Sequence, residues 1–248
     1  MAKISETGHA KNVANFGTLI TVVKGFKTTY NPSRTTITLT ALTTLKTNAD
    51  AVMAEVNVKL GAYSTAVAAR DNTFEPLGKL STRIINSLRS TDAPKQVIKS
   101  AEALVRKLQG QRATPKKTEE ELAALETEGS TVKQVSSSQM GFDNRINNFD
   151  SLIQLLITIA EYAPNEADLK TATLTTYLQS LQATNAAAGD AETNLDNARI
   201  ARNEVLYQPA TGLVDVAAAV KLYVKSVFGA TSAQYKQVSA LTFKAYGL

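Results

Sequence analysis

Apolar side chains recur at steps of three and four residues from Leu42 to Leu77, and this spacing constrains the fold more than any other feature of the chain. Such steps place the apolar side chains on one face of a helix, at the spacing of a coiled coil. A helix rises about 1.5 Å per residue, so this stretch would span roughly 50 Å. That length suits the central helix, or spine, of an elongated bundle. The positions that follow the spacing are Leu42, Leu45, Ala49, Val52, Val56, Leu60, Tyr63, Val67, Phe74 and Leu77, and Arg70 fills one further core-spaced position.

The spine occurs twice along the chain, at an almost constant offset. Identical residues are separated by 132 or 133 positions in a series of pairs that begins at Gly8 and continues to Leu80. Chance matches would scatter in offset, so the constant value predicts two tandem structural repeats. The pairs are Gly8 and Gly141, Asn15 and Asn148, Phe16 and Phe149, Pro32 and Pro164, Leu42 and Leu174, Arg70 and Arg202, Pro76 and Pro209, and Leu80 and Leu213.

A change of composition separates the two repeats. Residues 111–135 contain Pro115, a pair of lysines and a run of glutamates. We interpret them as a charged connector with a short helix that starts near Thr118. The first helical repeat then covers residues 1–110, and the second covers residues 136–248.

Composition and local signals favour an all-α fold. Only six prolines and twelve glycines occur in 248 residues, and 44% of the residues are hydrophobic, as expected for a helical protein with a substantial core. Residues 34–45 alternate like a strand, but their counterpart in the second repeat begins with Asn165 and two acidic residues, which is typical of a helix start. Pro76 and Pro209 fall inside helical patterns and should kink the spines. We therefore predict an elongated helical bundle of two tandem repeats, each with a long proline-kinked spine helix.

The sequence offers little chemistry for catalysis. It contains no cysteine, so neither a disulfide nor a thiolate metal site can form. It contains a single histidine, and we expect none of the usual nucleophile and base constellations around it. His9 occupies the position that Phe142 has in the second repeat, and we interpret it as filling a half-buried apolar position. We predict no catalytic, cofactor or metal site, and we expect that the protein is not an enzyme.

We expect neither a signal peptide nor a membrane span in this chain. Its start lacks an apolar signal core, and its longest apolar run, residues 152–160, is far shorter than the roughly 20 residues of a membrane span. Together with the absence of cysteine, these features predict a soluble cytoplasmic protein without a membrane span.

Arg70 and Arg202 occupy matching core-spaced positions in the two spines. The favoured interpretation is that their aliphatic stems pack while the guanidinium groups reach solvent or a nearby carboxylate. The alternative is a buried ion pair that sets the register of the two repeats.

Charge is distributed unevenly along the chain. The net charge of +5 divides into +8 for residues 1–110, −1 for residues 111–135 and −2 for residues 136–248. A basic first repeat and a mildly acidic second repeat favour contacts between the first repeat of one molecule and the second repeat of another. Lys79, Arg83 and Arg89 are the candidate contact residues, and Arg70 and Arg202 are candidates for setting the register. The alternative is a solvated surface whose charge has merely drifted.

Three functions agree with these features. The first is a non-enzymatic structural or scaffold protein that self-associates into an oligomer or a filament, so that its main partner is itself. The second is a protein that binds nucleic acid weakly and without sequence specificity, in keeping with a sequence pI near 9.3. The third is a toxin-like helical bundle that refolds into a membrane.

Five segments carry a resemblance to other proteins. They are GHAKNVANF, LVRKLQG, VSSSQM, ARNEVLY and TGLVDVA. With these segments the whole length resembles a group of uncharacterised bacterial all-helical proteins of similar size. The resemblance implies a helical fold and brings no activity, cofactor or site residue.

Overall fold

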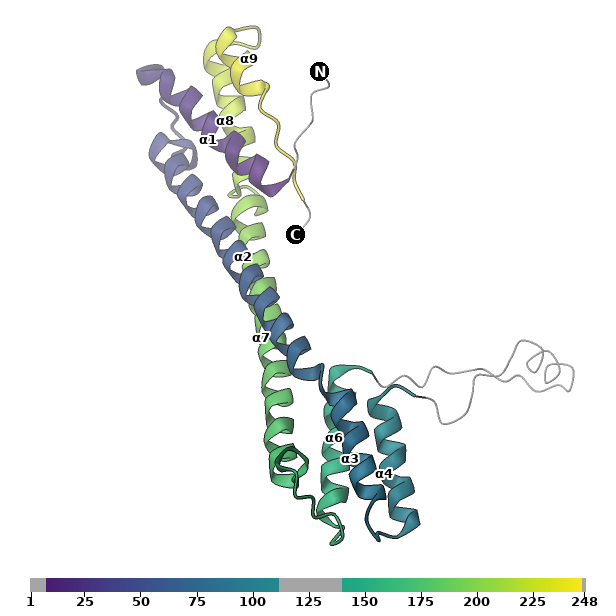
Figure 1. Ribbon diagram of the computed structural model, residues 1–248. Helices are drawn as coiled ribbons and strands as arrows, with labels where there is room; N and C mark the ends of the chain where they lie inside the picture. The colour runs from purple at the N-terminus through teal and green to yellow at the C-terminus, as the bar shows by residue number, and fades with distance from the viewer. Residues whose placement is uncertain (1–7, 112–139, 247–248) are drawn as a thin grey trace, which may run out of the picture. The chain divides into compact units, whose positions relative to one another are not determined.

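A computed structural model describes residues 8–111 and 140–246, and these residues form helices and no strand (Figure 1). The all-α class predicted from the sequence is therefore confirmed. Most of the predicted connector, with its short helix, lies outside the described residues. The elements are α1 (His9–Gly25), η1 (Lys27–Thr29), η2 (Thr35–Ile37), α2 (Leu39–Phe74), α3 (Leu77–Arg89), α4 (Lys95–Leu108), α6 (Phe142–Ile157), η3 (Ala167–Leu169), α7 (Thr171–Tyr207), α8 (Leu213–Phe228) and α9 (Ala233–Ser239).

Two helices are far longer than the others. Helix α2 has 36 residues and α7 has 37, and they contain most of the apolar positions of the two predicted spines. The stretch that alternates like a strand forms the short 3-10 turn η2 and then the start of α2. The hydroxyl oxygen of Thr38 accepts a hydrogen bond from the backbone N–H of Ala41, 3.3 Å away, which satisfies a donor that the first helical turn leaves free.

The two prolines end the long helices instead of bending them. Helix α2 stops at Phe74, and Pro76 immediately precedes the first residue of α3 with a helical φ of −71°. Proline has no N–H to donate within a helix, but it fits the start of one. Helix α7 stops at Tyr207, and Pro209 lies in the link to α8. The expected kink is therefore a break followed by a new helix.

Contacts divide the chain into two compact units. Unit 1 combines residues 1–64 with residues 191–248, and unit 2 comprises residues 65–190. Each unit thus joins part of the predicted first repeat to part of the predicted second repeat. The two units do not coincide with the predicted division at residues 1–110, 111–135 and 136–248.

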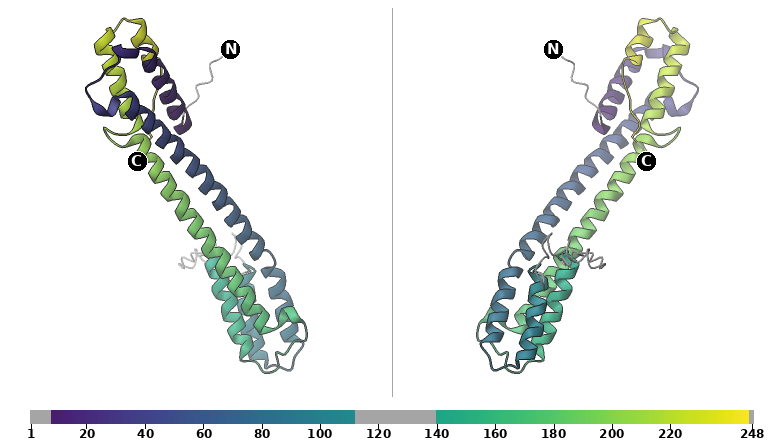
Figure 2. Two further views of the ribbon diagram at one scale, coloured as in Figure 1. Left: turned by 90° about the vertical axis from the view of Figure 1, so that its left-hand side faces the viewer. Right: turned by 90° about the vertical axis from the view of Figure 1, so that its right-hand side faces the viewer.

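Unit 1 is built around α8, which contacts α1, α9 and η2 (Figures 1 and 2). Its core contains fully buried side chains from five helices, α9 with Val238 among them, which places residues from both ends of the chain in one cluster. They include Phe16 and Leu19 of α1, Leu42 and Ala49 of α2, Leu206 of α7, and Leu213, Val220 and Val224 of α8.

Unit 2 is built around α4, which contacts both α3 and α6 (Figures 1 and 2). Its core again draws on both predicted repeats. Fully buried members include Leu77, Ile84 and Leu88 of α3, Ala101 of α4, Phe149, Leu152 and Ile153 of α6, and Leu174 and Leu181 of α7.

Candidate functional site

In unit 2, Arg70, the core-spaced arginine of the first predicted repeat, packs against the aromatic ring of Phe142. The guanidinium carbon of Arg70 lies 3.9 Å from the ring centroid of Phe142, the first residue of α6. Phe74 packs edge-on against the same ring, with 4.9 Å between the centroids. A guanidinium group over an aromatic face is attracted by the negative charge density of the ring. Asp71 is 3.9 Å from Arg70 and its side chain is 58% exposed, so the two do not form a buried ion pair.

A second arginine, which lies in α6, contacts Phe74. The guanidinium carbon of Arg145 lies 5.1 Å from the ring centroid of Phe74. Its Nη2 donates a hydrogen bond to the carbonyl oxygen of Phe74, 3.0 Å away. Burial lowers the pKa of the Arg145 guanidinium, which still remains charged at neutral pH. Arg145 therefore places a positive charge at the carboxyl end of α2, where the helix dipole is negative.

In unit 1, the residues that match Phe142 and Arg70 are His9 and Arg202, and their surroundings are polar. His9 stands in the place of Phe142, and its ring lies 5.6 Å from that of Tyr207. The His9 Nδ1 atom and the Tyr207 hydroxyl oxygen are 2.6 Å apart. Burial and then the nearby positive charge of Arg202 lower the pKa of His9. The imidazole is therefore neutral at neutral pH, and its tautomer sets which of the two groups donates this hydrogen bond.

Arg202 does not repeat the ring contact of its counterpart Arg70. Its Nε and Nη2 atoms donate hydrogen bonds to the side-chain oxygen of Asn203, at 3.1 and 2.8 Å. Burial lowers the pKa of Arg202. The two arginines thus occupy matching positions with different partners, an aromatic face in unit 2 and an amide in unit 1.

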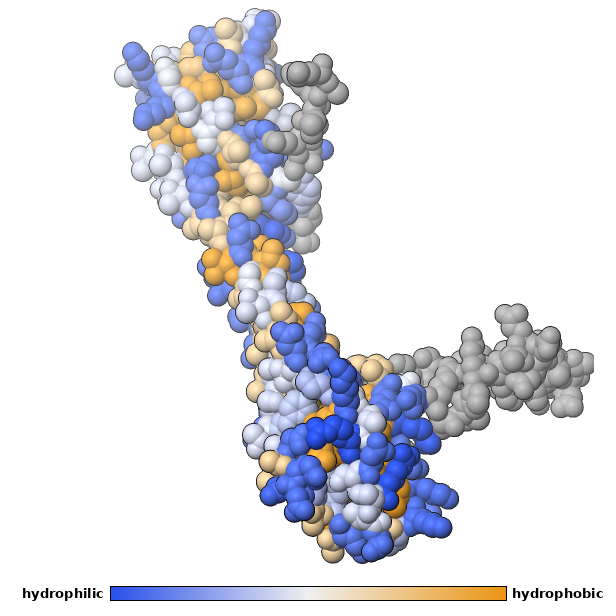
Figure 3. Space-filling view, in the orientation of Figure 1, coloured by the Kyte–Doolittle hydropathy of each residue, from blue (hydrophilic) through white to orange (hydrophobic). Residues whose placement is uncertain are grey.

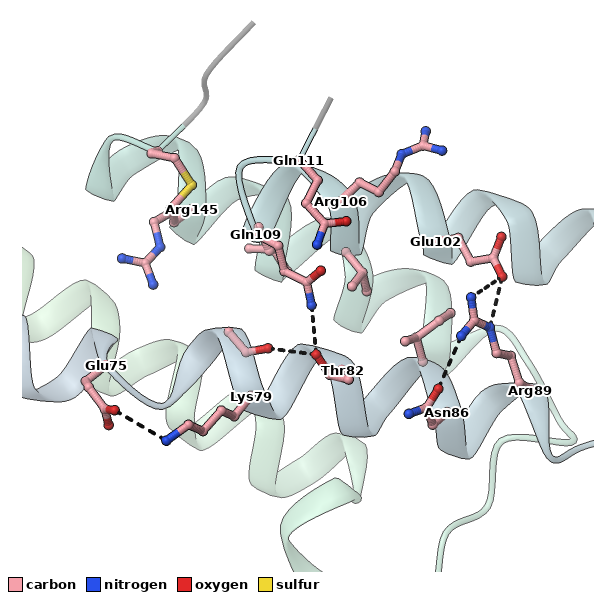
Figure 4. Close-up of a pocket in the computed structure, with 15 residues that line it drawn as sticks. Glu75, Lys79, Thr82, Asn86, Arg89, Glu102, Arg106, Gln109, Gln111 and Arg145 are labelled. Carbon is pink, nitrogen blue, oxygen red and sulfur yellow. Dashed lines mark hydrogen bonds and ion pairs between the residues drawn. The ribbon is translucent and has the colours of Figure 1, made fainter. Parts of the chain in front are cut away.

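An open groove of about 790 Å³ lies on unit 2 between α3 and α4, and we call it the α3–α4 groove (Figure 4). Figure 3 shows hydrophilic residues around small hydrophobic areas on the face that holds these helices. The lining mixes basic, acidic and amide side chains over an apolar floor. It consists of Glu75, Gly78, Lys79, Thr82, Ile85, Asn86, Arg89, Glu102, Val105, Arg106, Leu108, Gln109, Gln111, Met140 and Arg145.

Several charges of the groove are already paired. Arg89 forms an ion pair with Glu102 at 2.7 Å, and Lys79 is 3.8 Å from Glu75. The side-chain amide of Gln109 donates to the hydroxyl of Thr82 at 2.8 Å, which ties the end of α4 to α3. The lining contains no histidine or cysteine. This chemistry suits binding and packing and supplies no nucleophile with an adjacent base.

The structure separates the three candidate contact residues of α3. Lys79 and Arg89 line the groove, and their ion pairs stay within the first predicted repeat. Arg83 instead pairs with Asp168 of η3, and its Nη2 is 3.2 Å from the Asp168 Oδ1 atom. The hydrogen bond and charge of Arg83 lower the pKa of Asp168. Of the three residues, Arg83 is the one whose ion pair joins the first predicted repeat to the second.

Sequence reasoning missed the buried polar residues of α1 and α6. Asn12, Asn15 and Asn148 are 3%, 8% and 4% exposed, so their amides must find partners inside the protein. The signal was available, because Asn15 and Asn148 are a matched pair that directly precedes the buried Phe16 and Phe149.

The described parts of the chain hold no cluster of three or more His, Asp or Glu residues that would suit a metal ion. Across residues 8–111 and 140–246, no helix combines the length and apolar character that crossing a membrane requires. No family model, no curated protein and no solved structure matches the chain.

Proposed function

We propose that the chain is a tandem duplication and that it acts as a non-enzymatic structural protein, which self-associates into an oligomer or a filament. Matched positions with the same degree of burial support the duplication. Phe16 and Phe149 are both fully buried, as are Leu42 and Leu174. The 3-10 turns η2 and η3 begin at the common offset of 132, and so do the long helices α2 and α7.

The observation that carries the proposal is that each compact unit is closed by contacts between the two repeats. In unit 1, α1 of the first repeat lies against α8 and α9 of the second. In unit 2, α4 of the first repeat lies against α6 of the second, and Arg83 pairs with Asp168. Each repeat therefore presents surfaces that are complementary to the other repeat.

The same contacts can form between two chains. Exchange of identical elements between copies is a low-cost route to association, because the contacts of the exchanged form are those of the single chain. In an exchanged dimer, the first repeat of one copy completes its units with the second repeat of the other. If the exchange does not close on two copies, it propagates into a larger oligomer or a filament.

Charge favours this pairing of unlike repeats. The first repeat carries +8 and the second −2, so the two attract each other while two first repeats repel. Exposed charges are screened over about 10 Å at 0.1 M salt. They therefore orient the chains, and burial of apolar surface supplies most of the adhesion.

Engineered cysteines test the exchange, since the natural chain contains none. One chain carries Arg83→Cys and a second carries Asp168→Cys. The two are unfolded, refolded together over a range of protein concentrations, and treated with a short bis-maleimide cross-linker. We expect a covalent two-chain product whose yield rises with protein concentration, because exchange competes with closure inside one chain.

A single chain that carries both cysteines is the matched control, and it should cross-link within itself at low concentration. Light scattering on the natural chain measures association without labels. If the mixture gives no two-chain product and the natural chain stays monomeric at high concentration and low salt, the proposed self-association is wrong.

A further inference from the structure

The chain segment after α9 lies in an extended conformation on unit 1, and we call residues 241–246 the tail segment (Figure 1). Over residues 241–244 its side chains alternate between partly buried and exposed environments. Leu241 and Phe243 are partly buried against the core of unit 1, whereas Thr242 and Lys244 are exposed. Alternation with a period of two is the pattern of a peptide strand laid on a surface.

Two buried asparagines of α1 form hydrogen bonds with the backbone of the tail segment. The Asn12 side-chain amide donates to the carbonyl oxygen of Lys244 at 2.7 Å, and its oxygen accepts from the Lys244 backbone N–H at 3.0 Å. The Asn15 amide donates to the carbonyl oxygen of Thr242 at 2.7 Å. Contacts of this kind recognise an extended main chain whatever its side chains are, as in strand addition to a sheet edge.

Side-chain contacts add selectivity at both ends of the segment. The Lys221 ammonium of α8 donates to the carbonyl oxygen of Leu241 and lies 5.1 Å from the ring centroid of Phe243. The Tyr246 ring lies 5.1 Å from that of His9 and 5.9 Å from that of Tyr207. An extended peptide with aromatic side chains at these two positions therefore fits the surface between α1 and α8.

We propose that this surface, formed by α1 and α8, is a peptide-binding groove, and that the tail segment of a second copy of the chain enters it in place of the resident one. Every copy carries the same tail, so the exchanged tail makes the same hydrogen bonds and ring contacts as the resident tail. Only the connection at Ala240, which follows α9, changes direction. This contact rests on the proposed self-association and adds to it a specific link, distinct from the exchange of whole repeats.

The resident tail competes with any incoming one, because its covalent attachment gives it a high effective concentration. A variant that weakens only the resident tail therefore exposes the groove. In the full chain with Lys244→Pro, the tail loses the N–H that donates to Asn12, while α1 and α8 keep their sequence.

The groove is tested with a fluorescent peptide of residues 240–248 added to the full chain. The peptide should bind the Lys244→Pro chain at least about tenfold more tightly than the natural chain, because the resident competitor is weakened. Adding Asn12→Ala and Asn15→Ala to the Lys244→Pro chain should weaken binding roughly tenfold or more, because three hydrogen bonds to the peptide backbone are lost. Equal binding to the three chains would overturn the groove.

A control peptide with proline in place of Lys244 keeps the other side chains and lacks the same N–H. It should bind the Lys244→Pro chain roughly tenfold more weakly than the natural peptide. If the two peptides bind equally well, Asn12 does not recognise the peptide backbone as proposed.

Energy transfer between two full chains then tests the second copy as the partner. One chain carries a donor dye at Ala245→Cys, and a Lys244→Pro chain carries an acceptor at Ser226→Cys on α8. Entry of the donor tail into the groove of the acceptor chain brings the dyes together, and transfer between chains is the expected result. Exchange of whole repeats keeps each tail beside the α8 of its own chain, so it does not give this signal.

The two proposals therefore fail separately. If peptide binds but no transfer occurs between chains at concentrations that saturate peptide binding, the second copy is not the partner, and cross-linking between Arg83→Cys and Asp168→Cys chains is unaffected.

Discussion

The hydroxyl group of Tyr162 donates a hydrogen bond to the backbone carbonyl oxygen of Leu169, 2.9 Å away. Tyr30 makes the same bond to Ile37 at 2.7 Å. Each tyrosine follows the first helix of its predicted repeat, and each acceptor ends the 3-10 turn that precedes a long helix. The bond therefore closes the loop that directs the chain from one helix into the next, once in each unit.

Removing the Tyr162 hydroxyl should cost stability. Tyr162→Phe keeps the buried ring and leaves the carbonyl oxygen of Leu169 without its donor, so we expect a loss of about 1 kcal/mol in the free energy of unfolding. Denaturant unfolding measures this difference. Tyr63→Phe is the control, since Tyr63 is partly exposed, and it should change the stability much less. Equal losses in both variants would contradict the assigned role of the Tyr162 bond.

The same residue makes a prediction for alkaline pH. Burial raises the pKa of Tyr162 to about 12, whereas an unfolded tyrosine titrates near 10. Above pH 10 the unfolded chain loses this proton and the folded chain keeps it, so the stability from Tyr162 is complete below pH 10 and declines as the pH rises toward 12. The stability gap between the natural chain and Tyr162→Phe should therefore shrink from pH 9 to pH 11. A gap that widens would show that the pKa shift has the opposite sign.

His9 gives a direct electrostatic measurement, because it is the single histidine of the chain. The positive charge of Arg202 lowers the pKa of His9 in addition to the effect of burial. Replacing Arg202 by Gln removes that charge, so the pKa of His9 should rise toward its usual value near 6.5. NMR titration of the one imidazole follows it without overlap. Arg199→Gln removes a charge from the same helix and should shift the His9 pKa less.

His9 should also make the stability depend on pH below neutrality. Since the folded state holds the pKa of His9 below that of the unfolded chain, the unfolded chain binds the proton first as the pH falls through about 6.5. Stability is then lost toward pH 5. His9→Phe, which installs the residue of the matching position in unit 2, should flatten this dependence between pH 7 and pH 5. Parallel stability curves for the two proteins would contradict the assignment to His9.

Apolar spacing predicted the long helices and a constant offset predicted which residues correspond, but neither identifies packing partners. A helical pattern shows which face is buried, and it is the same whether the partner comes from the same repeat or from the other one. The interleaving of α1 with α8 and of α4 with α6 was therefore missed. The buried Asn12 and Asn15 were missed because asparagine is usually exposed, and their partners lie more than two hundred residues away in the sequence.

The correspondence between the two halves shifts after Pro76 and Pro209. Leu80 and Leu213 match at the offset of 133, yet Leu213 begins α8 fully buried, as Leu77 begins α3. Three more residues link α7 to α8 than link α2 to α3. Under the proposed duplication, these three residues are an insertion that moves the register of the later helices, and the Leu80–Leu213 identity conceals it.

Charge reversal at the Arg83–Asp168 pair provides a sharper prediction about assembly. Arg83→Glu places a carboxylate against Asp168, and Asp168→Arg places a guanidinium against Arg83, so each variant alone contains a repulsive pair. When the two variants are refolded together and exchange repeats, position 83 of each chain meets position 168 of the other. The new glutamate of the Arg83→Glu chain then faces the new arginine of the Asp168→Arg chain. Arg83 of the Asp168→Arg chain faces Asp168 of the Arg83→Glu chain. Both contacts are then attractive. Native mass spectrometry should show the mixed dimer in excess over either homodimer, most clearly at low salt, where exposed charges are least screened.

Lys79→Glu and Arg89→Glu provide the matched controls, because their ion pairs with Glu75 and Glu102 remain inside one repeat and travel together in any exchange. In a mixture of either variant with Asp168→Arg, the exchanged dimer holds one attractive pairing, between Arg83 of the Asp168→Arg chain and Asp168 of its partner, and one repulsive pairing, between Arg83 of the other chain and the new arginine. The mixed dimer therefore keeps an arginine–arginine repulsion that the mixture with Arg83→Glu removes. No excess of mixed dimer is expected in these mixtures. If Arg83→Glu gives no more mixed dimer than the two controls, the Arg83–Asp168 contact closes units only within single chains, and any oligomer that forms must use other surfaces.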